Sequence, residues 1–150
     1  MEKVLKQRFQ KYQKPKKAQL GKLKKKLWKI FSEFVRLSES DLDGNSQCVT
    51  CGLRVHWKAL QAGHFISGRN NGVLFDERNV HSQCAVCNIW KHGNLEEYYP
   101  YMLKKYGQGI IDSIKENKRN PPKLTVGWYE KSIEYYEDLV CKLKFEKKVF

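Results

Sequence analysis

A chain of 150 residues fits one compact domain with room for an arm. Lys and Arg number 29 against 16 Asp and Glu, and the formal net charge of +13 exceeds what solubility needs, which indicates a polyanionic partner. The N-terminus lacks the apolar stretch of a signal peptide, and no run of about 18 apolar residues occurs anywhere. We therefore expect a cytoplasmic protein without a membrane partner.

The basic excess is concentrated near the N-terminus. From Met1 to Lys29 the chain has twelve Lys or Arg and a single acid, Glu2. Residues 1–21 hold too few apolar side chains in register to bury a face, so we expect a basic arm that is mobile until it meets nucleic acid, followed by one folded domain over 22–150. The lysines in and beside this arm that are expected to contact phosphates are Lys14, Lys16, Lys17, Lys24, Lys25 and Lys26.

The first element expected after the arm is a helix. Apolar residues recur at helical spacing from Leu27, so a helix running to about Ser40 should place this face against the core. Between Cys48 and Asn94, glycines and polar turns separate short apolar stretches. This pattern predicts short strands and loops, with a short helix beginning near Cys87.

Helical patterns dominate the remainder of the chain. Asn94, with Glu97 three residues later, is expected to cap a helix that reaches Tyr106, and a shorter helix should follow around residues 110–114. Asn-Pro-Pro at 120–122 interrupts the chain, and a last helix should start near Thr125. The sequence therefore predicts an α+β fold in which helices flank a short-stranded segment at 47–94.

Four of the five cysteines form two C-x-x-C pairs, Cys48/Cys51 and Cys84/Cys87, which 32 residues separate. Disulfides are rare in the cytosol, so metal binding is the leading explanation. Four thiolates would close one tetrahedral zinc site with a structural role. A redox pair and buried free cysteines are the alternatives, and the paired spacing favours zinc. The fifth, Cys141, is expected to be a small buried or half-buried side chain.

The segment between the cysteine pairs holds His64, Asn79 and Asn88 in the order of an HNH motif. Hydrolysis of a phosphodiester needs a group that accepts a proton from water near pH 7, and a neutral imidazole at His64 suits that role. Asn79 is expected to hydrogen-bond the other ring nitrogen. Asn88 on the short helix is expected to hold Mg²⁺ or Mn²⁺, with His81 as the best additional ligand.

Each of these residues alone also fits a structural role. His64 could be a half-buried histidine with its hydrogen bonds satisfied, and Asn79 could cap a turn. Their joint order and spacing favour the HNH interpretation. In one respect the pattern departs from it, because many HNH sites carry Asp or His directly before the general base, whereas this chain has Gly63.

The runs CVTCG at 48–52, AGH at 62–64 and ERNVHSQCAVCN at 77–88 resemble the NinG/Rap recombination nucleases of lambdoid phages. The resemblance covers about residues 27–143. It implies a phage-encoded, structure-specific endonuclease that cuts branched recombination intermediates such as Holliday junctions and displaced-strand loops. It also implies that glycine before the general base is normal in this family. Lambdoid relatives can carry an additional N-terminal cysteine cluster, which the arm of this chain lacks.

The expected fold is therefore α+β, with a zinc-bound treble-clef ββα-metal core at 47–94 between N-terminal and C-terminal helices. Branched DNA is the expected partner, and a homodimer would suit a symmetric junction. A non-catalytic zinc module that binds DNA and a small RNA-binding zinc protein are the alternatives. A pure binder has no chemical use for the combined His and Asn residues, which favours an enzyme. Outside the arm, the residues expected to bind phosphates are Lys91, Arg69 and Arg78.

Overall fold

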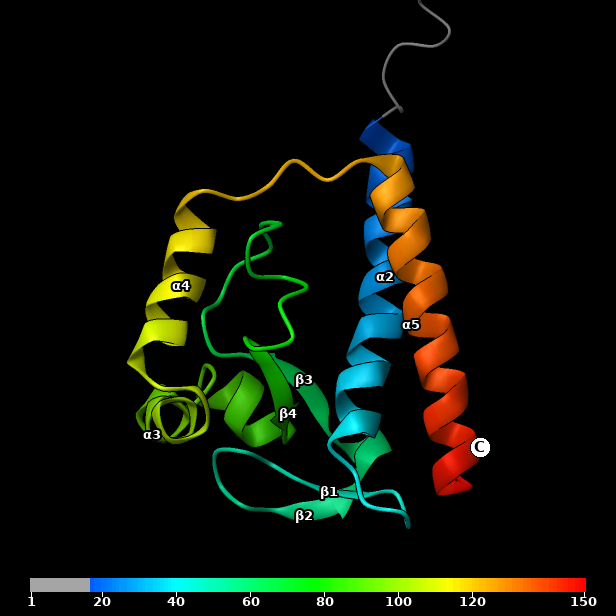
Figure 1. Ribbon diagram of the computed structural model, residues 1–150. Coiled ribbons are helices and arrows are strands. Elements are labelled where there is room, and N and C mark those ends of the chain that lie inside the picture. The colour runs from blue at the N-terminus through cyan, green and yellow to red at the C-terminus, as the bar shows by residue number, and fades with distance from the viewer. Residues whose placement is uncertain (1–16) are drawn as a thin grey trace, which may run out of the picture.

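The computed structural model describes residues 17–150, so the expectations for most of the basic arm, including Lys14 and Lys16, lie outside the described residues. Figure 1 shows two long helices, α2 (Lys17–Ser38) and α5 (Val126–Lys147), side by side and running in the same direction. The short strands and the helices α3 (Leu95–Tyr106) and α4 (Gln108–Arg119) lie to one side of this pair. No helix within residues 17–150 is long and apolar enough to cross a membrane.

Helix α2 begins earlier than the expected start at Leu27. Leu20 and Leu23 continue the apolar stripe toward the N-terminus at spacings of three and four residues, and both pack against the core. Residues 17–21, which were expected in the arm, are therefore helical. The end of α2 at Ser38 is close to the expected one.

The main core lies between the two long helices and the strands. Leu27, Phe31 and Val35 of α2 are buried one helical turn apart, and they face Ile133 and Tyr136 of α5. The Phe31 and Tyr136 rings meet edge to face, with centroids 5.2 Å apart. This packing fixes α2 as a rigid support beside the strands.

The strands form two small antiparallel sheets. Strands β1 (Asn45–Gln47) and β2 (Arg54–His56) make one hairpin, and β3 (Gln61–His64) pairs with β4 (Val80–Gln83). A single π-helical turn, Val86–Trp90, follows β4 where the sequence predicted a short helix. Together with the helices, these strands confirm the expected α+β class.

The register of β3 and β4 decides which side chains share a face. His64 lies opposite Val80, and Gly63 lies opposite His81. Because side chains alternate along a strand, His64 faces the α2 side of the sheet with Val80, and His81 points to the other face. Gln83, two residues beyond His81, lies on the same face as His81.

The starts of α5 and α3 are capped differently. The last helix begins near Thr125 as expected, and the Thr125 hydroxyl oxygen caps it by accepting a hydrogen bond from the Trp128 N–H at 3.1 Å. Asn94 stands at the start of α3, but its side chain does not cap the helix. Its backbone is left-handed with φ 48°, and its side-chain nitrogen donates instead to the sulfur of Cys87 at 3.4 Å. The expected cap at Asn94 was therefore wrong.

Helices α3 and α4 enclose a second core. Tyr98 and Met102 of α3 pack against Ile111 and Ile114 of α4, and the loop after β3 contributes Phe65. The buried Tyr98 hydroxyl donates to the Gly63 carbonyl at 2.9 Å, which ties α3 directly to the strand before His64. Both cores thus converge on the end of β3.

Candidate active site beside a four-cysteine cluster

The two C-x-x-C pairs come together in space. Cys48 and Cys51 lie at the hairpin between β1 and β2, Cys84 and Cys87 follow β4, and their four sulfur atoms all lie within 4.8 Å of one another. Four sulfurs about 2.3 Å from one zinc ion would be about 3.8 Å apart at the edges of a tetrahedron. The Cys51 and Cys84 sulfurs are 3.8 Å apart. The cluster can therefore hold a metal ion such as zinc.

Hydrogen bonds to sulfur favour the thiolate form of Cys48. Burial alone would raise the pKa of the Cys48 thiol, but hydrogen bonds, chiefly from the Thr50 hydroxyl at 3.2 Å, lower it to about 6. The backbone N–H of Cys87 donates to the Cys84 sulfur at 3.4 Å. Cys141, expected to be at least half-buried, is exposed on α5 and lies outside this group.

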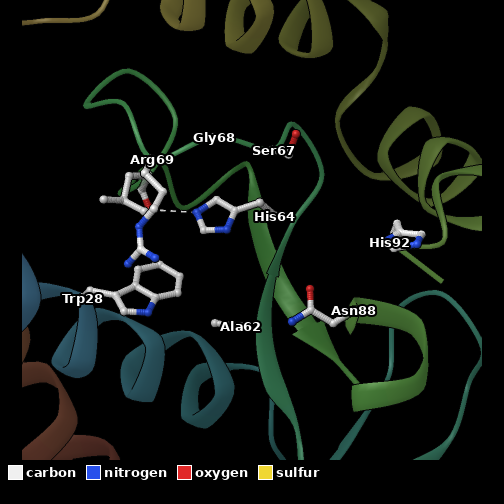
Figure 2. A pocket seen from close by; sticks show the side chains of 10 residues that line it. Trp28, Ala62, His64, Ser67, Gly68, Arg69, Asn88 and His92 are labelled. Carbon is white, nitrogen blue, oxygen red and sulfur yellow. Dashed lines mark hydrogen bonds between the residues drawn. The ribbon is translucent and has the colours of Figure 1, made fainter. Parts of the chain in front are cut away.

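A cavity of about 500 Å³ opens beside β3, next to the cysteine cluster. Figure 2 shows His64 and Asn88 in its wall, with Trp28 of α2 below His64 and Arg69 of the following loop beside Trp28. The cavity thus brings together His64 and Asn88, two of the three residues predicted to form an HNH motif, and Asn79 does not line it.

His64 is held on two sides. Its Nε2 lies 3.2 Å from the Leu74 carbonyl oxygen, and the Trp28 ring stacks on the imidazole with centroids 5.0 Å apart. A carbonyl oxygen only accepts hydrogen bonds, so Nε2 carries the proton and Nδ1 keeps its lone pair. Burial lowers the pKa of His64, and the Arg69 charge lowers it further, against the opposing effect of the Leu74 hydrogen bond. The imidazole is therefore neutral near pH 7, as a general base requires.

The Asn79 side chain does not hydrogen-bond His64, and this part of the expectation was wrong. Its fully buried amide accepts from the Ile66 N–H at 2.8 Å and donates to the carbonyls of Ile66 and Val73 at 3.0 and 3.1 Å. These bonds close the loop between β3 and β4, and that loop carries Leu74. Asn79 therefore acts on His64 only through the loop that presents the Leu74 carbonyl.

Asn88 stands on the π-helical turn, with its side chain in the cavity wall. Its Nδ2 donates to Gln61 Oε1 at 2.8 Å. Figure 2 shows the side-chain oxygen turned away from that nitrogen, toward the part of the cavity that His64 and His92 border. Asn88 thus offers an oxygen donor on the same cavity as the candidate base.

His81, the additional ligand suggested by its position after Asn79, lies away from this cavity. Its ring is 2% exposed, and Nδ1 bonds the carboxylate of Glu39, the residue directly after α2, at 2.6 Å. The same carboxylate accepts from the Ser82 N–H at 2.7 Å. The second ring nitrogen, Nε2, lies 3.2 Å from the Arg78 carbonyl oxygen, so neither nitrogen is left for a metal ion. His81 belongs to a structural contact between α2 and β4.

The basic residues expected to bind phosphates lie in different settings. Arg69 lines the cavity, whereas Arg78 forms a two-pronged ion pair with Asp76, at 2.9 and 2.7 Å. Lys24 donates to the Arg69 carbonyl oxygen at 2.6 Å and so anchors the loop between β3 and β4 to α2. Four predicted phosphate contacts remain in the described part of the chain. Lys17 is the first residue of α2, and Lys25 and Lys91 are exposed. Lys26 pairs with Glu137 at 3.0 Å.

Several residues of this site were not found from the sequence. Trp28 lies next to Leu27 on α2, and its place beside the apolar stripe gave no sign of a contact with His64. The Leu74 carbonyl carries no side-chain signal at all. His92 also lines the cavity, and its left-handed backbone, φ 49°, places it where the π-helical turn ends.

Fold and site define an α+β protein with a four-cysteine cluster beside a cavity that holds a neutral histidine. A family model described as Bacteriophage Lambda NinG protein matches residues 2–146, and the chain belongs to this family. The protein ninG of Escherichia phage 933W is 37% identical over 87 residues, which cover 56% of this chain and 40% of that protein. The ninG proteins of Escherichia phage lambda and Salmonella phage P22 are 36% and 34% identical, over 39% and 40% of their lengths.

The match thus spans about 40% of the length of these curated relatives. No solved structure matches the chain.

Proposed function

We propose that this protein is a metal-dependent DNA endonuclease of the HNH type, with His64 as its general base. The observation that carries the proposal is the neutral imidazole of His64, whose Nδ1 is free to accept a proton, in the wall of a cavity that also holds the Asn88 amide. The order of β3, β4 and the π-helical turn beside four cysteines supports a zinc-bound treble-clef ββα core.

In the proposed reaction, His64 Nδ1 takes a proton from the attacking water. The Leu74 carbonyl fixes the tautomer, and Trp28 holds the ring plane. Asn88 Oδ1 would hold a divalent cation such as Mg²⁺ or Mn²⁺, because hard cations take oxygen ligands. When bound, such an ion supplies charge neutralisation at the phosphate and at the leaving oxygen. Arg69 would contact a phosphate at the cavity.

DNA is the proposed substrate, and branched recombination intermediates are the proposed form. The net charge of +13 supports a polyanion, and exposed Lys25 and Lys91 are available for sequence-independent contacts with phosphates. The preference for branched DNA rests on membership of the NinG family.

The test is cleavage of linear, forked and four-way DNA by the purified protein, with and without Mg²⁺ or Mn²⁺. His64→Ala should lower the rate by about 10²- to 10⁴-fold, because a general base acts on the barrier. Zinc content and DNA affinity should stay near those of the parent. His56→Ala, at an exposed histidine on β2, is the matched control and should cut normally. Equal rates for His64→Ala and the parent would favour a non-catalytic DNA-binding module.

A further inference from the structure

The residue before His64 has no side chain because another side chain occupies its place. A Cβ atom on Gly63 would lie 2.0 Å from Gln83 Oε1 and 3.0 Å from Asn88 Oδ1. The first distance is far below any contact that real Cβ atoms make, so glycine is required while Gln83 keeps this position. The side-chain oxygens of Gln83 and Asn88 thus both lie within 3.0 Å of the position that a Gly63 Cβ would occupy.

The orientation of the Gln83 amide is fixed by its nitrogen. Nε2 donates to the Gly93 carbonyl oxygen at 2.9 Å and to Thr50 Oγ1 at 3.2 Å. The Gly93 carbonyl only accepts hydrogen bonds, so it requires the amide nitrogen on its side. The oxygen must therefore face Gly63.

Gln83 Oε1 has no hydrogen-bond partner among the described residues, although Gln83 is fully buried. Buried polar side-chain atoms normally have a partner in the protein or an ordered ligand. Here the amide is turned, by two bonds on its other end, so that its acceptor points at the one position of the strand that has no side chain. An arrangement of this kind suits a bound cation, which needs oxygen atoms without competing donors.

We propose that Gln83 Oε1 and Asn88 Oδ1 together hold the divalent cation. Gln83, on β4, thereby supplies a side-chain oxygen at a position of the strand where Gly63 has no side chain. The inference rests on the proposed nuclease function and adds a ligand to its site. Both ligands are uncharged, so the ion should bind weakly to the free protein and more tightly when DNA phosphates complete its coordination. The same Gln83 nitrogen bonds connect this site, through Thr50, to the Cys48 sulfur.

The first test displaces the Gln83 oxygen without removing it. In Gly63→Ala the new methyl group must push the amide aside, and the backbone of Gly63 lies outside the left-handed region, so alanine fits the chain path. Mn²⁺ binding to zinc-loaded protein without DNA, measured by electron paramagnetic resonance, should weaken by about 10- to 100-fold. Gly127→Ala on α5, where a methyl group meets nothing within 4 Å, is the control and should bind Mn²⁺ as the parent does.

The second test replaces the ligand. Gln83→Ala should lose Mn²⁺ binding, and adding Gly63→Asp to it should restore binding, because a carboxylate can then enter the space that the amide left. Zinc content and the thermal midpoint show whether each variant is folded. Recovery in the double variant separates a missing ligand from a damaged fold.

Unchanged Mn²⁺ affinity in folded Gly63→Ala and Gln83→Ala proteins would overturn the inference and leave the nuclease proposal intact. Failure of the parent to cut any DNA would overturn the nuclease proposal, while the loss and recovery of Mn²⁺ binding would still establish Gln83 as a ligand.

Discussion

Trp28 of α2 lies nearly parallel to the imidazole of His64, with the ring planes 19° apart. The contact joins the first long helix to the end of β3 and covers one face of the candidate base. It contributes to the burial that lowers the pKa of His64, together with the positive charge of Arg69.

Replacing Trp28 with leucine should raise the pKa of His64 toward its ordinary value, because water would reach the exposed ring face. The imidazole would then be protonated over a wider range, and the acid limb of the cleavage rate should move to higher pH. NMR titration of the His64 ring protons measures the shift directly. Trp28→Phe should keep most of the effect, and Trp128→Leu on α5 should leave the titration unchanged.

Zinc should be present at about one ion per chain, because four thiolates close one tetrahedral site. Cys84→Ser should lose the metal and unfold the segment around β3 and β4, since metal binding is coupled to folding. Elemental analysis and circular dichroism check both effects. Cys141→Ser, at the exposed cysteine of α5, serves as the control. Metal-free parent protein with an intact fold would contradict this prediction.

Much of the local structure could be predicted from the sequence, because spacing alone carries it. The two cysteine pairs, the helical turn near Cys87 and the start of the last helix near Thr125 depend on residues a few positions apart, and each appears in the structure.

The partners of His64 could not be predicted in the same way. Trp28 and Leu74 reach it through tertiary packing, and nothing in their local sequence marks them. Asn79 was chosen for its residue type, but its amide is saturated by loop backbone groups instead. His81 has the right chemistry, but its two ring nitrogens are engaged by Glu39 and by the Arg78 carbonyl oxygen.

Glu39→Gln should destabilise the protein by about 1 to 3 kcal/mol at pH 7, because the Ser82 N–H and His81 would lose a charged acceptor. Burial would raise the pKa of Glu39, but the hydrogen bond and charge of His81 and the bonds to Ser82 leave it below its ordinary value. A lowered folded pKa contributes stability above the ordinary Glu pKa of about 4.3 and loses it as the pH falls through the folded value.

Urea unfolding of the parent and of Glu39→Gln should therefore differ clearly at pH 7, and the difference should shrink as the pH falls below the ordinary Glu pKa of about 4.3. Glu33→Gln is the control, since Glu33 forms a more exposed ion pair with Lys144 and should cost less. A gap between the parent and Glu39→Gln that stays constant across this range would show that the carboxylate charge contributes nothing.

Deleting residues 1–16 should weaken binding to every DNA form. The deleted segment contains six Lys or Arg, and every phosphate that these side chains neutralise adds about 0.9 to the slope of log affinity against log salt for duplex DNA. The truncated protein should therefore show a shallower slope, which fluorescence anisotropy at several salt concentrations measures. All described elements from α2 onward remain in the truncated chain, so zinc content should be unchanged. An identical slope would mean that the segment binds no phosphates.

Helix α2 and the residue that follows it contact the strand pair and its loop at three levels. Lys24 holds the loop at Arg69, Trp28 covers His64, and Glu39, directly after the helix, binds the backbone of β4. The stretch 47–94 therefore carries His64, Asn79 and Asn88 but lacks the helix contacts that hold them in place. Grafted onto another protein, this stretch should still bind a zinc ion, but the His64 ring would be free to turn. A transplantable form of the proposed nuclease must start at α2 and keep α5, which packs against α2.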